Sequence, residues 1–445
     1  MDRLSETLHD LVQTGRRDRL AQVLQEAHAA DIATAVRDLS VADQVTVFRL
    51  LGREQAGGVL AELDDQTLLE LVRALDEAEI SSVLDRMQPA DAAGVLEELP
   101  QEQAEKVLDL MKEDKSEEVQ ELLEYGEKTA GRIMSPDWLA VHENVTVAQA
   151  IEQVRKSPVA ETAQSVYVVD HHEHLIGSLP LRRLIIADPS TPVGLLRQEE
   201  PVSVRPETDQ EEVAQLVAKY DLVAVPVVDR DHRLLGVISV DDVIDIIREE
   251  ATEDIQRFGG AAGDETVFDP ANTVFAKRLV WRLVNLATAI LAASVIGLFE
   301  GSIRELATLA IFMPIVASMG GISTTQTATV VIRGIALGDM TTAHVWRVLW
   351  KEFNLGLTTG VANGLVMGVI AYLWKGQRLL AVIIAVAMVI NMLMAAAVGV
   401  VIPLLLKSFR ADPAIASSVI ITTFTDVCGF FSFLGLATLL IRFLL

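Results

Sequence analysis

The sequence predicts a multi-domain membrane protein that combines an all-α superhelical N domain, two α/β domains in tandem, a charged plug helix and a five-helix transmembrane domain. Three observations predict this organisation. Leu and Val recur at three- and four-residue spacing through residues 1–130, as amphipathic helices require. A pattern of strand, helix and hairpin occurs twice, in residues 131–195 and 196–248. After a plug segment, 249–275, residues 276–445 contain five long apolar runs.

The N domain is expected to consist of short helices separated by polar joints. Residues 58–63 and 94–99 both read Gly-Val-Leu-x-Glu-Leu, which forms a weak internal repeat. Stacked helical hairpins bury such repeated apolar faces against their neighbours, so the repeat predicts a small superhelical bundle. The same pattern is also typical of a purely structural or interaction domain.

Each of the two middle copies is expected to form a short strand, a capped helix, a β-hairpin and a final helix. Thr146 and Thr208 are the expected N-caps, and the hairpins are residues 166–177 and 224–237. These pieces resemble a tandem pair of CBS domains, which form an α/β fold.

Many CBS domains bind an adenine nucleotide through the motif Gly-h-h-Ser/Thr-x-x-Asp, in which h is a hydrophobic residue. The second copy carries this motif as Gly236, Ser239 and Asp242, whereas the first copy lacks both the hydroxyl and the carboxylate. The resemblance therefore implies a single candidate nucleotide site per chain, for ATP at the second CBS domain. Asp242 has a second interpretation, because an acid in the first turn of a helix also interacts favourably with the helix dipole.

The segment after the second copy reads as one helix with an acidic side and an apolar side. Asp242 and Asp245 stand three residues apart, as do Glu250 and Glu253, and Glu249 adds to the acidic side. Like charges at this spacing repel each other unless a cation screens or bridges them. A divalent cation would join these acids, and its loss would push the elements apart. A solvated acidic face is the alternative.

Charge divides the chain into two parts of different character. From Ala271 onward twelve Lys and Arg stand against six Asp and Glu, a net charge of +6, so the whole-chain charge of −25 leaves −31 on residues 1–270. An acidic front part is unlike a nucleic-acid-binding surface, and no nucleic-acid partner is expected. The single cysteine, Cys428, excludes an intramolecular disulfide. The polar start of the chain is not expected to be a signal peptide.

Five apolar runs are each long enough to cross about 30 Å of hydrocarbon. They cover residues 278–299, 305–327, 352–374, 379–406 and 414–441. The side of the N-terminus carries Lys277, Arg278, Arg282, Arg333, Arg347, Lys351, Lys407 and Arg410, and the other side carries Arg304, Lys375, Arg378 and Arg442. The positive-inside rule therefore predicts a multi-pass protein of the cell membrane with cytoplasmic N-terminal domains and the C-terminus on the outer side.

One carboxylate, that of Asp426, lies inside the last apolar run. A charge at mid-bilayer costs on the order of 2.5–3.5 kcal/mol and is usually retained only where it faces water or a cation. Thr422 and Ser418 precede it by one and two helical turns on the same face. Carboxylate and hydroxyl oxygens suit a hard cation such as Mg²⁺. The alternative is a structural polar contact with another helix.

The domain order and the membrane part resemble the MgtE family of magnesium channels over nearly the whole chain. The matching positions are Pro314, Gly320, Gly321 and Gln326, residues 333–339, the Asp412-Pro-Ala start of the last run, and residues 422–430. The resemblance implies a homodimer in the lipid of the cell inner membrane, with Asp426 lining the pore and holding hydrated Mg²⁺. It also implies that cytosolic Mg²⁺ bridges acids of the N domain, the CBS domains and the plug helix and so closes the pore. In that arrangement Glu250 and Glu253 share an ion with Asp412, and the further regulatory acids are Asp91, Asp242, Asp245 and Glu249.

Two departures from the family pattern leave alternatives open. Ile322 and Thr324 stand where the family has an amide and a glycine, and Asp91 alone remains of the acidic motif in the N domain. A transporter or exporter of other divalent cations, such as Co²⁺ or Mn²⁺, is one alternative. A membrane sensor of CBS type that conducts nothing is another. No Ser/His/acid or metal-hydrolase pattern stands out, so the chain is not expected to be an enzyme.

Overall fold

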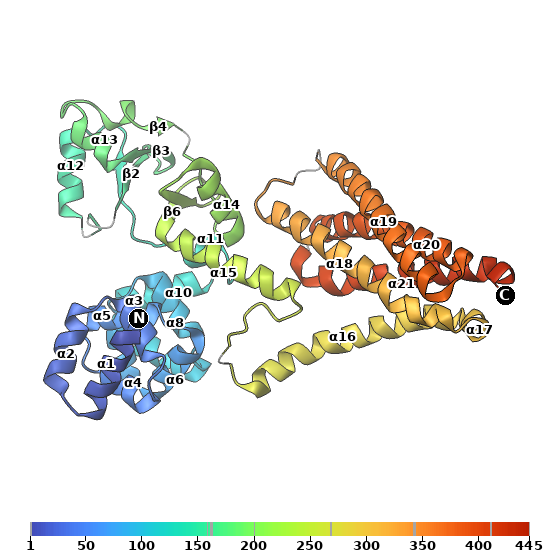
Figure 1. Cartoon of the computed structure of the whole chain (residues 1–445). Coiled ribbons are helices and arrows are strands. Elements are labelled where there is room, and N and C mark those ends of the chain that lie inside the picture. The colour runs from blue at the N-terminus through green and yellow to red at the C-terminus, as the bar shows by residue number, and fades with distance from the viewer. Residues whose placement is uncertain are drawn as a thin grey trace. The chain divides into compact units, whose positions relative to one another are not determined.

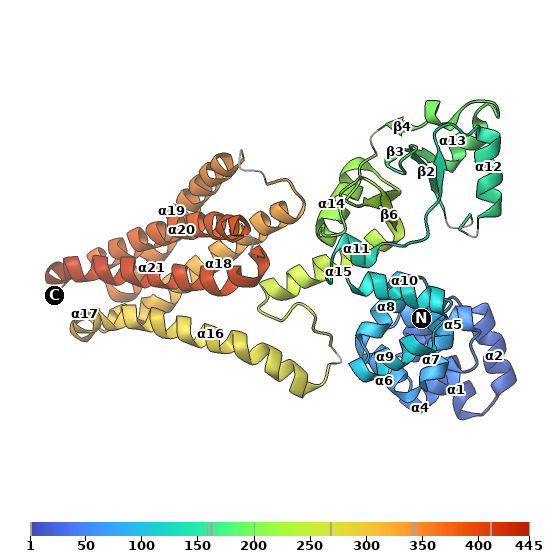
Figure 2. The same ribbon diagram turned by 180° about the vertical axis from the view of Figure 1, so that it is seen from behind.

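The computed structural model of the chain describes residues 2–157, 159–160, 163–199, 201–267, 269–340, 344–409 and 412–444. Its contacts divide the chain into two compact units, residues 1–248 and 249–445. Figures 1 and 2 show the helices and strands of both units from opposite sides.

The N domain is a stack of short helices, as the periodicity predicts. They are α1 (Asp2–Gln13), α2 (Arg17–Glu26), α3 (Ala29–Val36), α4 (Val41–Phe48), α5 (Arg53–Ala61), α6 (Asp65–Ala74), α7 (Glu77–Leu84), α8 (Pro89–Glu97), α9 (Gln101–Leu110) and α10 (Glu113–Leu123). Helix α1 contacts α3, α3 contacts α5, α5 contacts α7, and α7 contacts α9. This repeated contact between helices two apart confirms the predicted superhelical bundle.

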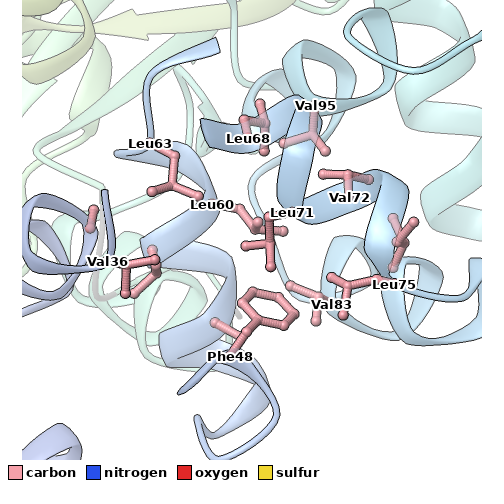
Figure 3. Packing of buried hydrophobic residues seen from close by; sticks show 14 of the residues in the cluster. Val36, Phe48, Leu60, Leu63, Leu68, Leu71, Val72, Leu75, Val83 and Val95 are labelled. Carbon is pink, nitrogen blue, oxygen red and sulfur yellow. The ribbon is translucent and has the colours of Figure 1, made fainter. Parts of the chain in front are cut away.

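One continuous apolar core runs through this stack (Figure 3). Phe48, Leu60 and Leu71 point into it from three different helices, and each is buried. Polar joints fix where the helices begin. Asp76, for example, accepts a bond from the backbone N–H of Glu79, whose side chain accepts in return from the backbone N–H of Asp76. Such a capping box satisfies two backbone donors that the helix leaves free.

The two CBS copies follow α11 (Ala130–Ile133). The first contains β1 (Ala140–His142), α12 (Val147–Lys156), β2 (Ser165–Val169), β3 (Leu175–Pro180), α13 (Leu181–Ile186) and the 3-10 turn η1 (Val193–Leu195). The second contains α14 (Gln210–Tyr220), β5 (Ala224–Val228), β6 (Leu234–Ser239) and α15 (Val240–Phe258), after the short β4 (Gln198–Glu199). Strand β1 is parallel to β2, the pairs β2–β3 and β3–β4 are antiparallel, and β5–β6 form a separate antiparallel hairpin.

The caps of the two copies differ from each other. Thr146 caps α12 as predicted and forms a capping box with Gln149. Thr208 was expected to cap α14, but that expectation is wrong, because Asp209 occupies the N-cap and accepts from the N–H of Glu211 at 2.8 Å. The hydroxyl of Thr208 instead accepts from the N–H of Arg205 at 3.1 Å. A carboxylate one residue further along therefore takes the capping role, and Thr208 closes the preceding turn.

The second unit contains the long apolar helices: α16 (Ala271–Gly297), α18 (Thr308–Ala336), α19 (Val345–Lys375), α20 (Arg378–Ser408) and α21 (Pro413–Leu444), with the short α17 (Glu300–Glu305) between the first two. Among the described residues, five helices are long and apolar enough to cross a membrane. The run expected to end at residue 327 continues as α18 to Ala336. Hydroxyl groups such as that of Thr324, which donates to the carbonyl of Gly320 at 2.9 Å, are satisfied within the helix and do not end it.

Helices α19 and α20 approach each other closely along a stripe of glycines. Gly356, Gly360, Gly364 and Gly368 are buried at four-residue intervals on one face of α19. A Cβ atom added at Gly364 would lie 2.7 Å from the carbonyl oxygen of Ala385 in α20. Small residues at this spacing let two helix backbones pack against each other in an apolar medium. The backbones of α19 and α20 therefore lie in close contact.

Candidate ion pathway and regulatory acids

Asp426 lies in α21 and is half-buried. Within the described part of the chain its carboxylate makes no hydrogen bond and no ion pair. The alternative interpretation, a carboxylate paired with a neighbouring helix of its own chain, is thus not what these residues form. Val419 and Thr422 precede Asp426 by seven and four residues and so share its helix face. The side chain of Ser418 lies outside the described residues.

A buried amide packs against the helix that carries Asp426. Asn391 of α20 is 1% exposed and donates from Nδ2 to the carbonyl of Val316 in α18 at 2.6 Å. A Cβ atom added at Gly320 of α18 would lie 2.4 Å from this amide nitrogen, and one added at Gly429 of α21 would lie 3.2 Å from it. Two glycines on two helices thus make room for one amide, and Gly429 comes three residues after Asp426.

A polar hollow of about 570 Å³ opens beside Thr422. It is bounded by α21 at Val419 and Thr422, by α16 at Arg278, Arg282 and Asn285, and by the glycines that follow α15. Because Val419, Thr422 and Asp426 share one face, the hollow opens on the Asp426 side of α21, one turn away from the carboxylate.

The end of α15 and the start of α21 share a group of acids. Arg257 forms ion pairs with Glu253 and with Asp412, and Asp412 also caps α21 by accepting from the N–H of Ala414 at 2.7 Å. Burial, together with the neighbouring charges of Asp412, Glu250 and Glu253, raises the pKa of Asp254 to about 6. The structure therefore brings Glu250, Glu253 and Asp412 into one group, and their sharing of an ion stays a prediction of the family resemblance.

Sequence reasoning missed Arg257, although it is the cation of this group. Its spacing of four residues from Glu253 was a local signal for the pair within the helix. Its contact with Asp412, which lies 155 residues away, has no local signal.

A second group of acids lies in the first unit. Burial, followed by the charges of Asp242, Asp245 and Glu62, raises the pKa of Asp91 to about 6. Part of the Asp91 side chain remains exposed, which leaves water access to the group. Three of the predicted regulatory acids, Asp91, Asp242 and Asp245, thus lie near one another, and Glu249 is exposed one helical turn after Asp245 on α15.

The nucleotide motif of the second CBS copy is closed by its own hydrogen bonds. Asp242 accepts from the N–H and the hydroxyl of Ser239 at 3.0 and 2.7 Å, and Ser239 Oγ accepts from the N–H of Asp242 at 3.3 Å. Ser239 and Asp242 therefore form a capping box at the start of α15. A Cβ atom at Gly236 would lie 2.6 Å from Met134 Sδ, so this glycine permits a close approach that a larger residue would prevent.

The matching position in the first copy is covered by the chain itself. A Cβ atom at Gly177 would lie 2.6 Å from the side chain of Arg197, whose guanidinium is 3.1 Å from Glu143. The aliphatic carbons of Arg197 cover Gly177, whereas Met134 and the backbone oxygen of Ser135 lie over Gly236 in the second copy.

Among the described residues, no three His, Cys, Asp or Glu side chains group closely enough to hold a bare metal ion. The acids instead stand in looser groups with water access. Such groups suit a cation that keeps most of its hydration shell, as Mg²⁺ does.

Three family profiles match the chain. One described as "Divalent cation transporter" covers residues 313–436, and one described as "MgtE intracellular N domain" covers residues 27–128. The CBS domain profile matches twice, at residues 130–190 and 195–249.

Two named relatives share these features over most of their length. The magnesium transporter MgtE of Thermus thermophilus is 34% identical over 447 residues, which cover 99% of this chain and 99% of that protein. The magnesium transporter MgtE of Bacillus subtilis is 32% identical over 322 residues, which cover 72% of this chain and 71% of that protein.

Two solved structures resemble the front part of the chain. One is the soluble part of a magnesium transporter, with a TM-score of 0.51 and 30% identity over 56% of this chain and 99% of the other. The second is the cytosolic domain of the Mg²⁺ channel MgtE in complex with ATP, with a TM-score of 0.52 and 35% identity over 54% of this chain and 99% of the other. Both confirm a helical N domain followed by a CBS pair.

Proposed function

Because the chain belongs to the MgtE family of magnesium transporters, we propose that it is a magnesium channel that closes when cytosolic Mg²⁺ rises. The observation that carries this proposal is Asp426, a carboxylate in an apolar helix with no protein partner among the described residues. A charge of this kind is costly in a membrane unless water or a cation reaches it. A conducted cation would supply the positive charge that neutralises the Asp426 carboxylate.

The proposed ion path runs along the Asp426 face of α21. Asp426 attracts the ion, while the hydroxyl of Thr422 and, one turn further, that of Ser418 contact its water shell. Mg²⁺ dehydrates reluctantly, so one carboxylate and several hydroxyls suffice to guide it. In a homodimer two such faces meet around a central path, which gives the ion a carboxylate on each side.

The proposed gate uses the two groups of acids. Glu250, Glu253 and Asp412, together with Asp254, repel one another when no ion is bound, and so do Asp91, Asp242 and Asp245. Mg²⁺ bound between the acids of each group favours the compact, closed arrangement and shifts the population toward it. The pKa values of Asp91 and Asp254, both raised to about 6, support this proposal because neighbouring carboxylates contribute to each shift after burial.

ATP is the proposed cofactor of the second CBS domain, since a relative's cytosolic domain is described in complex with ATP. Gly236, Ser239 and Asp242 would hold it, and the bonds between Ser239 and Asp242 must then open. The side chain of Arg197 over Gly177 supports a single site per chain.

We further propose that residues 1–130 form the N domain, 131–195 and 196–248 the two CBS domains, 249–275 the plug and 276–445 the membrane domain. The acidic front part lies in the cytoplasm, and the C-terminus lies on the outer side of the cell inner membrane. A broader cation range, including Co²⁺ and Mn²⁺, is the second candidate, and the family's description as a divalent cation transporter favours it.

Flux of Mg²⁺ into liposomes tests the pore directly. Asp426→Ala and Asp426→Asn should lower the flux at least tenfold, whereas Glu300→Gln, which changes an exposed acid of α17, should leave it unchanged. Wild-type flux in both Asp426 variants would remove the pore assignment. No Mg²⁺ flux in the wild type or the variants would favour a sensor that conducts nothing. Parallel measurements with Co²⁺ and Mn²⁺ separate the two cation ranges.

A further inference from the structure

The hollow beside Thr422 carries an unbalanced positive charge. Arg282 of α16 lines it, is exposed, and makes no hydrogen bond or ion pair within the described part of the chain. Arg278, one turn earlier, lines the same hollow but is neutralised by Glu265, with Nη2 and Nε at 2.6 and 2.8 Å from Oε2. Lys277 is likewise paired with Asp264 at 2.6 Å. Only the charge of Arg282 thus faces the hollow without a described counter-ion.

The position of this charge relates it to the ion path. Helix α16 contacts α21, and the two helices converge toward the end of α16 (Figures 1 and 2). The hollow touches α21 at Val419 and Thr422, which share a face with Asp426. An ion moving along this face toward Asp426 from the end where α21 begins therefore passes Arg282 first.

We infer that Arg282 is a fixed positive charge in the inner vestibule of the cation path and makes outward flow slower than inward flow. This inference rests on the proposed function and adds a direction to it. A fixed charge at a mouth changes the local ion concentration and thereby the rate at which ions enter from that side. Ions that enter from the opposite mouth are unaffected until they leave.

The size of the effect follows from Coulomb's law. At a separation on the order of 10 Å in water, repulsion between one positive charge and a divalent cation lowers the local ion concentration about fourfold. Salt reduces this value, and the apolar walls of α16 and α21 increase it. A severalfold asymmetry between inward and outward current is expected.

Single-channel recording in inside-out patches from bacterial spheroplasts, where the orientation is native, measures this asymmetry. Equal, low Mg²⁺ on both sides keeps the channel available, and the amplitude of an open channel does not depend on how often it opens. The ratio of inward to outward current at equal and opposite voltages should fall severalfold in Arg282→Gln, reverse in Arg282→Glu and persist in Arg282→Lys. Arg304→Gln, which removes an exposed arginine of α17, is the matched control and should leave the ratio unchanged.

Two results would overturn the inference. One is a wild-type current ratio in both Arg282→Gln and Arg282→Glu. The other is loss of all current in these two variants while Arg282→Lys conducts, since the charge would then be required for conduction. Asp426→Ala, recorded in parallel, shows which of the two proposals fails. Wild-type current in Asp426→Ala would refute the assignment of Asp426 to the pore. If Asp426→Ala loses its current while the ratio of inward to outward current is unchanged in the Arg282 variants, only the proposed role of Arg282 is refuted.

Discussion

The ion pairs of Arg257 give the sharpest test of the proposed gate. Arg257→Gln removes the cation that joins the end of α15 to the start of α21. The side chains of Arg257 and Asp412 are 29% and 26% exposed, and that of Glu253 is 9% exposed. The ion pairs are thus partly buried, neither fully exposed nor fully excluded from water.

These exposures bracket the magnitude. Fully exposed pairs contribute about 0–1 kcal/mol, and removing one partner of a buried pair costs about 3–5 kcal/mol. For a guanidinium that is about a quarter exposed and holds two carboxylates, we expect about 1.5–2 kcal/mol. At about 1.4 kcal/mol per factor of ten, local opening should become roughly 10- to 30-fold more frequent.

Hydrogen exchange of the full-length protein measures this opening. The N–H groups of Gly259, Gly260 and Ala261 donate to carbonyls in the last turn of α15 and report its undocking. In Mg²⁺-free buffer they should exchange about 10- to 30-fold faster in Arg257→Gln than in wild type, and less so in Arg257→Lys. Saturating Mg²⁺ should shrink the difference, because the ion then supplies the missing positive charge.

The reasoning fails in either of two cases. If exchange in Arg257→Gln equals that of wild type, the ion pairs do not hold α15 in place. If the difference is the same with and without Mg²⁺, the acids around Arg257 do not bind the ion.

Three further predictions use other parts of the structure. The pKa of Asp91 is raised to about 6, so protonation stabilises the compact arrangement at low pH and this stabilisation is lost as the pH rises through 6. Asp91→Asn should therefore raise the melting temperature at pH 7.5 and leave it unchanged at pH 4. The gain in the free energy of unfolding should be at most about 1 kcal/mol, because the side chain is partly exposed. An equal gain at both pH values would contradict this prediction. Gly320→Ala should destabilise the membrane domain by about 1–3 kcal/mol in detergent melts, since its Cβ atom would lie 2.4 Å from a buried amide, whereas Gly321→Ala meets nothing within 4 Å and should be neutral. Asp242→Ala should weaken ATP binding at least tenfold in equilibrium dialysis, whereas Arg183→Ala, at the corresponding place in the first CBS copy, should not; equal losses would contradict a single site.

Periodic patterns made the fold predictable. Apolar spacing fixed the helices of the N domain, and strand–turn–strand runs fixed both hairpins, because local burial decides these elements. Strand pairing between the two CBS copies could not be predicted from these local patterns. The strand expected to open the second copy is reduced to β4, which pairs with β3 of the first copy, and Val204 joins Val227 only through an isolated bridge.

The candidate site was predictable where a residue contradicted its surroundings. Asp426 stands out because a carboxylate in an apolar run needs a physical reason, and the acidic face of α15 stands out by its charge. Asn391 did not stand out, because an amide in an apolar helix usually marks ordinary helix contact. Its role depends on Gly320 and Gly429, two glycines from distant segments that only the fold brings to the same amide.

The arrangement around Arg257 also explains why such a gate would respond to Mg²⁺ over a limited range. Glu253 and Asp412 pair with one guanidinium, and Asp254 lies close to them and to Glu250, so these five side chains carry more negative than positive charge at neutral pH. The guanidinium is covalently attached and always present, which sets a baseline affinity between α15 and α21 that no ion concentration changes. In the proposed gate, free Mg²⁺ acts on the remaining negative charge of these side chains, and a ligand shifts a two-state equilibrium only by its difference in affinity for the two states. A stronger internal cation would hold the gate closed without Mg²⁺, and a weaker one would let repulsion keep it open at any ordinary concentration. The balance between these four acids and Arg257 would therefore influence the Mg²⁺ concentration at which the proposed gate closes.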